Sequence, residues 1–337
     1  MTSTVLGARS RRRAVVLPAV GVAFAAGVVL ALGVGSVVIA APDVLAALAG
    51  RAASTVHAAI VWDVRLPRIL LALLVGACLA VSGALLQAVV GNPLADPGLT
   101  GVTAGAASVV LVILLAVPAA TGLVPPAAFA GGCVAAGLVY ALAWRRSGMR
   151  PLDIILAGVA VNAVAGAVIG LLSLRFSDRQ PAAIQRLNGS LAAKGMDTVL
   201  LLVPYAAVGL VAALACSGKA NILRLGDAVA GNLGENVART RLILSAVAVF
   251  LAAVAVAAVG VLGFLGLVVP HLARLLVGSD HRVLLPLSAL LGALLLLVSD
   301  TIGRTAFAPV EIPAGIVMAF VGAPYFLFLL RRSGAPR

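Results

Sequence analysis

The feature that most constrains this chain is its series of long apolar runs, which are separated by short polar connections. A membrane-spanning helix needs roughly 20 mainly apolar residues, so the chain has room for about ten such helices. Hydrophobic residues make up 63% of its 337 residues and charged residues only 10%, whereas soluble domains are about half apolar and about a quarter charged. Lipid is therefore the expected solvent, and no room is left for a soluble catalytic domain.

The continuity of these runs decides between the two architectures that can cross a bilayer. Lipid-facing backbone must satisfy its hydrogen bonds internally, which leaves helices or closed β-barrels. A barrel needs alternating apolar and polar residues, and the runs here do not alternate. Glycine and proline are tolerated in membrane helices, where glycine also permits close approach of a neighbouring helix. We therefore expect an all-α protein.

Apolar length and polar punctuation predict ten helices. The first follows the basic stretch Arg9–Arg13 and is too long for a signal-peptide core of about 7–15 residues, so we expect it to be retained. The chain then divides into a basic N-terminus (1–13), one transmembrane domain (14–331) and a tail (332–337). The predicted helices are Ala14–Ala41, Leu66–Val90, Leu99–Val117, Ala127–Trp144, Asp153–Ser173, Thr198–Cys216, Arg241–Val259, Leu262–Val277, Val283–Ser299 and Ile312–Leu330.

The basic residues give an independent test of this arrangement. With the N-terminus inside, 16 of the 24 Lys and Arg residues fall on the cytoplasmic side, as the positive-inside rule requires. Both termini are then cytoplasmic. The net charge of +13 is interpreted as a topology signal, so no nucleic-acid partner is expected. The residues on the outer side are Arg51, Arg65, Arg68, Arg175, Arg179, Arg186, Lys194 and Arg304.

The sequence lacks the motifs of common enzyme and ATP sites. Ser217–Ala220 (SGKA) has neither the upstream glycine nor the hydroxyl of a phosphate-binding loop, and the three histidines show no metal-binding spacing. The acidic residues fall at or near the ends of the predicted helices, whereas ion-coupled carriers usually hold carboxylates near the bilayer midplane. We expect neither an enzyme nor a bound cofactor or metal, but either a passive conduit or a subunit whose energy comes from elsewhere.

Two connections are unusually polar for such a chain, namely Leu174–Asp197 on the outer side and Ser217–Thr240 on the inner side. The inner connection has leucine and alanine at helix-like spacing but is too polar to span a membrane. A short surface helix that faces a partner and ordinary interfacial amphipathicity both fit this pattern, and the residues alone do not decide between them.

Several strings, in order and spacing, resemble the FecCD-type family of ABC-importer permeases, which includes iron–siderophore, cobalamin and haem permeases. The resemblance covers about Arg65–Leu330. One departure is Leu187–Asn188, because the family often has an aromatic residue before Gly189. The strings are Arg65–Arg68 (RLPR), Ser82–Gln87 (SGALLQ), Asn92–Pro97 (NPLADP), Gly101–Ala106, Gly263–His271 with Arg274, Gly278–Arg282, Asp300, Arg304, Glu311–Ile316 (EIPAGI) and Gly322–Phe326.

The resemblance implies a ten-helix permease of the type II ABC importer fold in a bacterial cytoplasmic membrane. Its implied partners are a second permease subunit, two cytoplasmic ABC ATPases and an extracytoplasmic solute-binding protein. A ferric siderophore is the expected cargo, and cobalamin or haem is the alternative. An ion-coupled secondary transporter is a rival from another class, and a membrane enzyme built on His271, Arg274, Asp280 and His281 is a more distant one.

Three arginines are candidates for docking the solute-binding protein. Arg65 and Arg68 flank Pro67, which suits the first turn of a helix, so we expect both guanidiniums at the outer surface. In the family, outward arginines here and at the position of Arg304 resemble docking points for acidic residues. Charge-assisted pairing with carboxylates suits arginine. Ordinary snorkelling at the membrane interface is the alternative.

The inner connection corresponds to the family's coupling helices, which seat in a groove of the ATPase. Small residues would permit close approach of the two backbones, and leucines would be apolar anchors. A solvated loop is the alternative. The residues assigned to this coupling surface are Leu225, Gly226, Asp227, Ala230, Leu233 and Gly234.

Two further features are candidates for the transport pathway. The turn at Asn92 and Leu94, held by neighbouring prolines, resembles part of the family's inner gate, although plain turn chemistry also explains the prolines. Gly158, Asn162 and Gly166 recur at about one-turn spacing on the fifth predicted helix, together with Gly170. This stripe either lines a wide pathway or packs against another helix.

Overall fold

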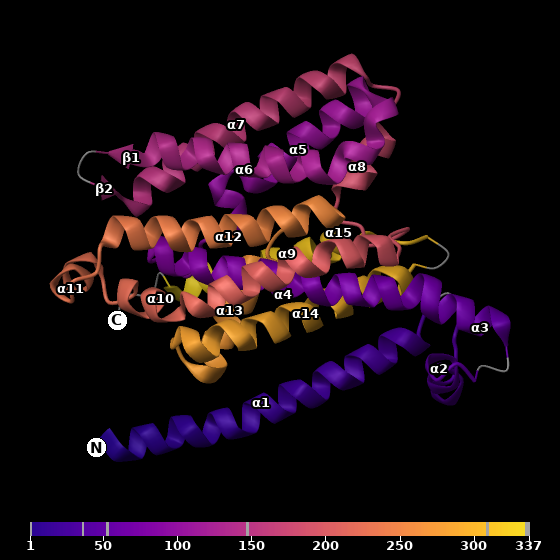
Figure 1. Ribbon diagram of the computed structural model, residues 1–337, viewed down its shortest axis with the longest axis horizontal. Helices are drawn as coiled ribbons and strands as arrows, with labels where there is room; N and C mark the ends of the chain where they lie inside the picture. Colours follow the sequence, from indigo (N-terminus) through magenta and orange to yellow (C-terminus); the bar gives the residue numbers. More distant parts are fainter. Residues whose placement is uncertain (1, 36, 52–53, 146–147, 308–309, 334–337) are drawn as a thin grey trace.

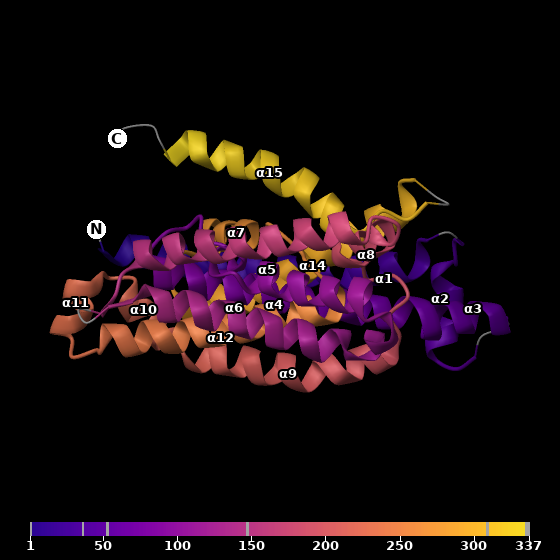
Figure 2. The ribbon, with the colours of Figure 1, turned by 90° about the horizontal axis from the view of Figure 1, so that it is seen from above.

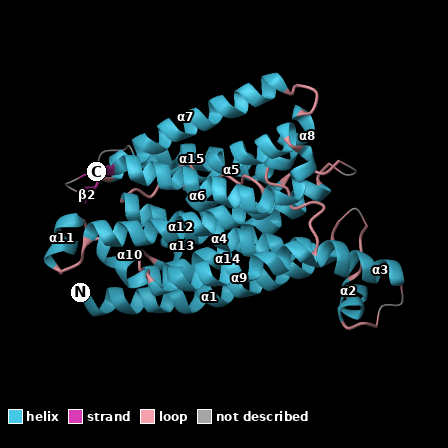
Figure 3. Cartoon of the chain, turned by 45° about the horizontal axis from the view of Figure 1, so that its top comes forward, coloured by secondary structure: helices cyan, strands magenta, loops and turns pink. Residues whose placement is uncertain are grey.

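The computed structural model describes residues 2–35, 37–51, 54–145, 148–307 and 310–333, and almost all of this part of the chain is helical (Figure 3). Six of its helices are long and apolar enough to cross a membrane, and four shorter apolar helices accompany them. The all-α fold expected from the sequence is confirmed. A two-stranded antiparallel hairpin, β1 (Trp144–Arg145) and β2 (Gly148–Met149), connects two of the helices.

Each of the ten predicted helices has a counterpart. These are α1 (Thr2–Gly33), α4 (Leu66–Val90), α5 (Val102–Leu111), α6 (Val124–Ala143), α7 (Pro151–Arg175), α9 (Met196–Ala215), α12 (Val237–Val259), α13 (Leu265–Val277), α14 (His281–Thr305) and α15 (Ala314–Ser333). The structure adds short elements that the sequence did not reveal: α2 (Ala41–Leu48), α3 (Thr55–Ala59), the π-helix η1 (Ile60–Arg65), the 3₁₀-helices η2 (Pro97–Thr100) and η4 (Pro118–Leu123), the π-helix η3 (Val112–Ala116) and α8 (Gln180–Leu187). The inner connection, for which a short helix was one of two interpretations, forms α10 (Ser217–Leu223) and α11 (Asp227–Asn232).

Helix α4 is the core of the bundle. It packs against α14, α12, α13 and α9, and 83% of its apolar window is buried. Helices α5, α6 and α7 form a layer on the far side of α12, and α1 lies along α14 (Figure 1). Helix α15 leans away from the bundle (Figure 2). Helix α7, by contrast with α4, is only 22% buried.

Glycines bring α4 into backbone contact with its neighbours. A Cβ atom on Gly83 would lie 1.9 Å from the carbonyl oxygen of Gly266 at the start of α13, and one on Gly76 would lie 2.3 Å from that of Gly292 in α14. Real side-chain atoms cannot approach so closely, so these helix crossings require glycine. Such small-residue contacts are a principal source of helix association in membranes, where dispersion replaces the hydrophobic effect.

The short elements gather at the two ends of the bundle. Both described ends of the chain, the β1–β2 hairpin, α10 and α11 lie at one end, which we call the termini end (Figures 1 and 2). Helices α2, α3 and α8 lie at the other end, which we call the far end. The candidate site residues divide between these ends and the exposed helix α7.

Candidate functional site

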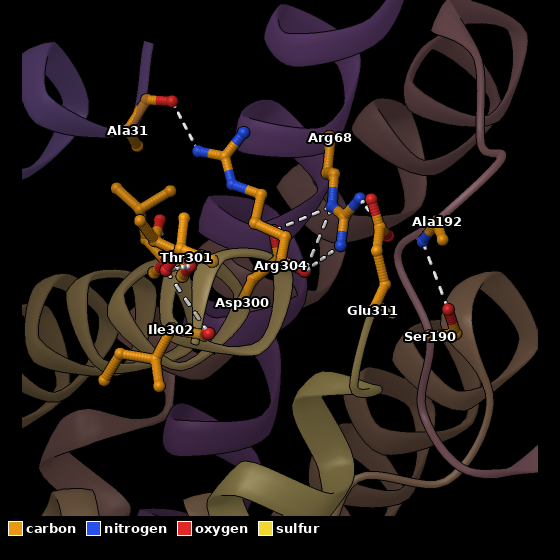
Figure 4. Close-up of polar contacts among 11 residues, drawn as sticks. Ala31, Arg68, Ser190, Ala192, Asp300, Thr301, Ile302, Arg304 and Glu311 are labelled. Atoms are coloured by element: carbon orange, nitrogen blue, oxygen red, sulfur yellow. Dashed lines mark hydrogen bonds and ion pairs between the residues drawn. The ribbon is translucent and has the colours of Figure 1, made fainter. Parts of the chain in front are cut away.

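Arg68 is the centre of a buried ion cluster at the far end. It lies in the first turn of α4, and its guanidinium makes a bidentate contact with Asp300 of α14, with Nε–Oδ2 at 2.8 Å and Nη2–Oδ1 at 3.0 Å. A second ion pair joins Nη1 to the Glu311 carboxylate at 2.8 Å (Figure 4). Asp300 is buried, whereas the Glu311 side chain is 41% exposed. The cluster therefore ties α4 to α14 and to the segment before α15.

Arg65 and Arg304 hold the end of α1. Arg65 donates to the carbonyl oxygens of Leu32 and Val37, and Arg304 donates to that of Ala31 (Figure 4). The last carbonyls of a helix have no partner within it and need donors from elsewhere. A cation at this position also complements the helix dipole. The two arginines thus bind carbonyl groups of the last turn of α1 and of Val37, which follows it.

The expectation that these arginines lie at the outer surface is wrong. Arg65, Arg68 and Arg304 are only 3%, 8% and 6% exposed. The physical reason is that the helical path does not begin at Leu66, because α3 and η1 continue it backwards to Thr55. The side chains consequently lie inside the bundle end, surrounded by α1 and α14.

The coupling segment forms two short helices at the termini end, not one. Leu225 and Leu233 are exposed there, as expected for apolar anchors, and Val229 is exposed with them. Ala230 is completely buried and faces the bundle, so it does not belong to an approach surface. Gly226, directly before α11, and Gly234, just after its end, have φ angles of +95° and +80°, a backbone conformation that other residues rarely adopt.

Asp227 connects this segment to the bundle. Its carboxylate accepts a hydrogen bond of 2.9 Å from Nη2 of Arg241, a residue one turn into α12 that is 4% exposed. The Arg241 guanidinium also donates to the carbonyl oxygens of Val89, near the end of α4, and Met149, in β2. Sequence reasoning counted Arg241 only as a topology signal. Because Arg241 stood at the first residue of the predicted helix, close to Arg239, nothing in the sequence indicated a specific role.

The turn after α4 has defined internal bonds. The Asn92 side chain accepts the backbone N–H of Leu94 at 2.9 Å, which is the local turn chemistry typical of asparagine. Leu94 packs against the cluster of Leu267, Val268 and Leu329 on α13 and α15. Burial raises the pKa of the Asp96 carboxyl, which follows the turn, to about 6, although a hydrogen bond from the Gly98 backbone N–H acts in the opposite direction.

Gln87 and Arg274 fasten this turn from the bundle side. The Gln87 amide nitrogen donates to the carbonyl oxygens of Ala95 and Gly266 at 3.3 and 3.2 Å, and Arg274 Nη2 donates to the Gln87 Oε1 atom at 2.6 Å. Arg274 of α13 thereby connects this helix to α4.

The stripe on α7 has two parts with different surroundings. A Cβ atom on Gly158 would lie 1.8 Å from the Leu99 carbonyl oxygen, and the Asn162 amide donates to the Gly98 carbonyl oxygen at 3.0 Å. These two residues therefore pack against η2. A Cβ atom added to Gly166 or Gly170 would meet no described atom within 4 Å, and both glycines lie on the exposed face of α7. Only this second part is free to line a pathway.

A pair of matched glycine substitutions distinguishes the packed part of the α7 stripe from its exposed part. We expect Gly158→Ala to destabilise the protein by about 1–3 kcal/mol through overpacking against η2, and Gly166→Ala to leave the melting temperature in detergent unchanged. If Gly166→Leu reduces transport without lowering that temperature, a pathway role for this face is supported. Equal stability of the two alanine variants would contradict the packing described for Gly158.

The fold, with its long apolar helices, defines a polytopic membrane protein. A sequence profile for the FecCD transport family matches residues 23–332. The chain belongs to this family, which confirms the resemblance inferred from the short motifs. It is accordingly a membrane-spanning permease, and the family is one of transport subunits that are not themselves enzymes.

Relatives in several organisms are similar over most of their length. The chain is 41% identical to the Fe(3+)-citrate import system permease protein YfmE of Bacillus subtilis, over 90% of both chains. It is 41% identical to the hemin transport system permease protein HmuU of Yersinia pestis, over 82% of this chain and 85% of that one. It is 44% identical to the cobalamin import system permease protein BtuC of Halobacterium salinarum, over 81% and 73%.

The fold has a solved counterpart. A metal-chelate type ABC transporter in an inward-facing conformation superposes with a TM-score of 0.83 at 30% sequence identity, over 94% of this chain and 99% of that one. The all-helical permease fold expected from the sequence is therefore shown both by the described residues, with six long and four shorter apolar helices, and by the similarity to this neighbour.

Proposed function

We propose that this chain is the permease subunit of an ATP-binding-cassette importer that carries ferric siderophore complexes across a bacterial cytoplasmic membrane. The observation that carries the proposal is membership of the FecCD transport family over residues 23–332. The similarity to an iron(III)-citrate permease over 90% of both chains supports a metal-chelate cargo. Import of haem or cobalamin is the alternative, which the similarity to permeases for those cargoes favours.

In this proposal the termini end faces the cytoplasm. Most of the basic residues lie in segments at that end, as the positive-inside rule requires. The exposed leucines of α10–α11 then face two ATPase subunits, which hydrolyse the ATP that this chain has no motif to bind. The far end faces outward and receives the solute-binding protein.

A second permease subunit, identical or related, completes the pathway in this proposal. Helix α7 exposes Val164 and Leu171, and α15 exposes Phe320 and Leu327. Both helices lie along the long direction of the bundle (Figures 1 and 2). Apolar faces of this kind face either lipid or a neighbouring subunit. A path between two copies would use the open part of the α7 stripe and the turn at Asn92 and Leu94 as its inner gate.

Docking through Arg65, Arg68 and Arg304 stays a prediction, and the buried cluster gives it a specific form. A carboxylate of the binding protein would reach Arg68 by replacing Glu311, the more exposed of its two acidic partners. Arg65 and Arg304 would support that contact by holding α1 in place. Glu311→Gln, which frees the site without removing an arginine, is the variant that tests exchange by measuring binding-protein affinity.

The experiment that tests the proposed function is uptake of ⁵⁵Fe-labelled ferric siderophores by cells that lack this chain. We expect uptake to fall to background and to return with the wild-type chain, with its ATPase and binding protein present. Labelled haem and cobalamin are measured in parallel. Unchanged iron uptake together with lost haem or cobalamin uptake would overturn the siderophore assignment and keep the importer. Uptake that follows an ion gradient without the ATPase would overturn the importer itself.

A further inference from the structure

Arg241 connects three elements of the termini end. Among the described residues, no other side chain forms hydrogen bonds with all three. Its guanidinium donates to Asp227 of α11 at 2.9 Å, to the Val89 carbonyl oxygen of α4 at 3.1 Å and to the Met149 carbonyl oxygen of β2. The side chain is 4% exposed, so its position is fixed by these bonds and by packing. A planar guanidinium with several donors is suited to such a three-way contact.

The two carbonyl groups that Arg241 binds lie just before two segments assigned to the transport pathway. Val89 is near the last residue of α4, directly before the turn Gly91–Ala95. On the other side of the turn, the Ala95 carbonyl oxygen accepts from Gln87, which in turn accepts from Arg274. Met149 ends the hairpin that leads into α7. Arg241 thus contacts the segments that precede both the turn and the α7 stripe.

The third partner, Asp227, lies on the exposed surface. Its side chain is 55% exposed, and it starts the helix whose outward face carries Val229 and Leu233. A cavity of about 450 Å³ separates α11 from the end of α4, and both Asp227 and Arg241 line it. Space beside the ion pair leaves α11 room to shift relative to α4, with the pair as a direct connection between them.

We propose that Arg241 is a positioning residue that transmits displacement of α11 to the turn Gly91–Ala95 and to the β1–β2 hairpin. This inference rests on the proposed function, because it takes α11 as the surface that an ATPase moves. A charge-assisted hydrogen bond is directional and about twice as strong as a neutral one, so it can carry a displacement that apolar contact across a cavity cannot.

The test uses Asp227→Asn, which keeps the shape of the side chain and removes its charge, in the complete complex reconstituted in liposomes with its ATPase and binding protein. The readout is cargo transported per ATP hydrolysed. We expect this ratio to fall about two- to fivefold, because a pair with one largely exposed partner contributes up to about 1 kcal/mol. Asp227→Glu, which keeps the charge, should restore it in part. Arg282→Gln removes an exposed cation at the start of α14 and should leave the ratio unchanged.

Hydrogen exchange of backbone amides shows how far a displacement of α11 extends into the protein. In the wild-type complex, exchange of the Leu94 and Ala95 amides should differ between the nucleotide-free and vanadate-trapped states. In Asp227→Asn, peptides from α11 should still respond to trapping, whereas peptides containing the turn should not. A merely structural role would lower assembly of the complex and both rates together, leaving the ratio and the response of the turn as in wild type.

The outcomes distinguish failure of the proposed function from failure of this inference. A wild-type complex without ATP-dependent transport overturns the proposed function and this inference with it. A wild-type complex that transports, combined with an Asp227→Asn complex of unchanged ratio and unchanged response in the turn, overturns the inference alone. The inference is supported if Asp227→Asn lowers the ratio of cargo to ATP, and if trapping then changes hydrogen exchange in α11 but not in the turn.

Discussion

Replacing Asp300 by alanine is expected to destabilise the folded protein by about 3–5 kcal/mol, because it leaves the Arg68 guanidinium buried without its main carboxylate partner. Arg68 is 8% exposed, and three of its four side-chain hydrogen bonds are with Asp300. The measurement is the free energy of unfolding in detergent micelles by denaturant titration. Purified yield of monodisperse protein gives a second measure if the variant is too unstable to titrate.

Two companion variants make this prediction specific. Glu311→Gln should cost less than about 1 kcal/mol, since the Glu311 side chain is substantially exposed and exposed ion pairs contribute little. The double replacement Arg68→Met with Asp300→Leu should recover most of the stability lost in Asp300→Ala, because well-packed apolar residues often replace a buried ion pair without loss. An Asp300→Ala protein as stable as wild type would show that water or lipid headgroups reach Arg68.

Replacing Gly83 by alanine is expected to cost about 3 kcal/mol, at the upper end of the usual cost of overpacking. The new methyl group would lie 1.9 Å from the Gly266 carbonyl oxygen, and backbone atoms cannot move aside as a flexible side chain can. Helices α4 and α13 would have to separate, which also disturbs the Gln87 contact with Gly266. The melting temperature of the purified protein checks this result.

The matched control for Gly83 is Gly137→Ala in α6. No described atom lies within 4 Å of the position that its Cβ would occupy, and alanine is the better helix former by about 0.5–1 kcal/mol. Gly137→Ala should therefore be neutral or slightly stabilising. Similar losses in both variants would mean that glycine is required along these helices for a reason other than close crossing.

Much of the helix arrangement followed from apolar length alone. The α-helix Leu66–Val90 has the same bounds in prediction and structure, and Gly91, with φ of +66°, ends it. The sequence did not predict that α3 and η1 continue its path back to Thr55. The first helix, predicted to reach Ala41, ends at Gly33. Among the apolar residues after Gly33 is Val37, which is not helical and whose carbonyl oxygen is bound by Arg65. A hydropathy pattern cannot detect this bond between distant parts of the chain.

The arginine cluster shows the same limit more clearly. Arg68 lies at the end of an apolar run, and such a position ordinarily indicates an exposed cation. Its acidic partners follow 232 and 243 residues later, so no local pattern connects them. In the coupling segment the sequence identified the exposed leucines correctly, whereas the inward position of Ala230 depends on how α11 packs. The division of the α7 stripe depends likewise on η2, an element that no periodicity predicted.

Helix α4 has a consequence for how the two membrane faces communicate. Its 25 residues make a rod about 37 Å long, which is more than the roughly 30 Å thickness of the hydrocarbon core. Arg68 anchors one end of this rod and the Val89 carbonyl oxygen is gripped at the other. Between these two points, backbone-to-backbone contacts hold the helix against α13 and α14. A single unbroken helix therefore bridges the two surfaces, and the distance between the contacts made at each surface is set by its length.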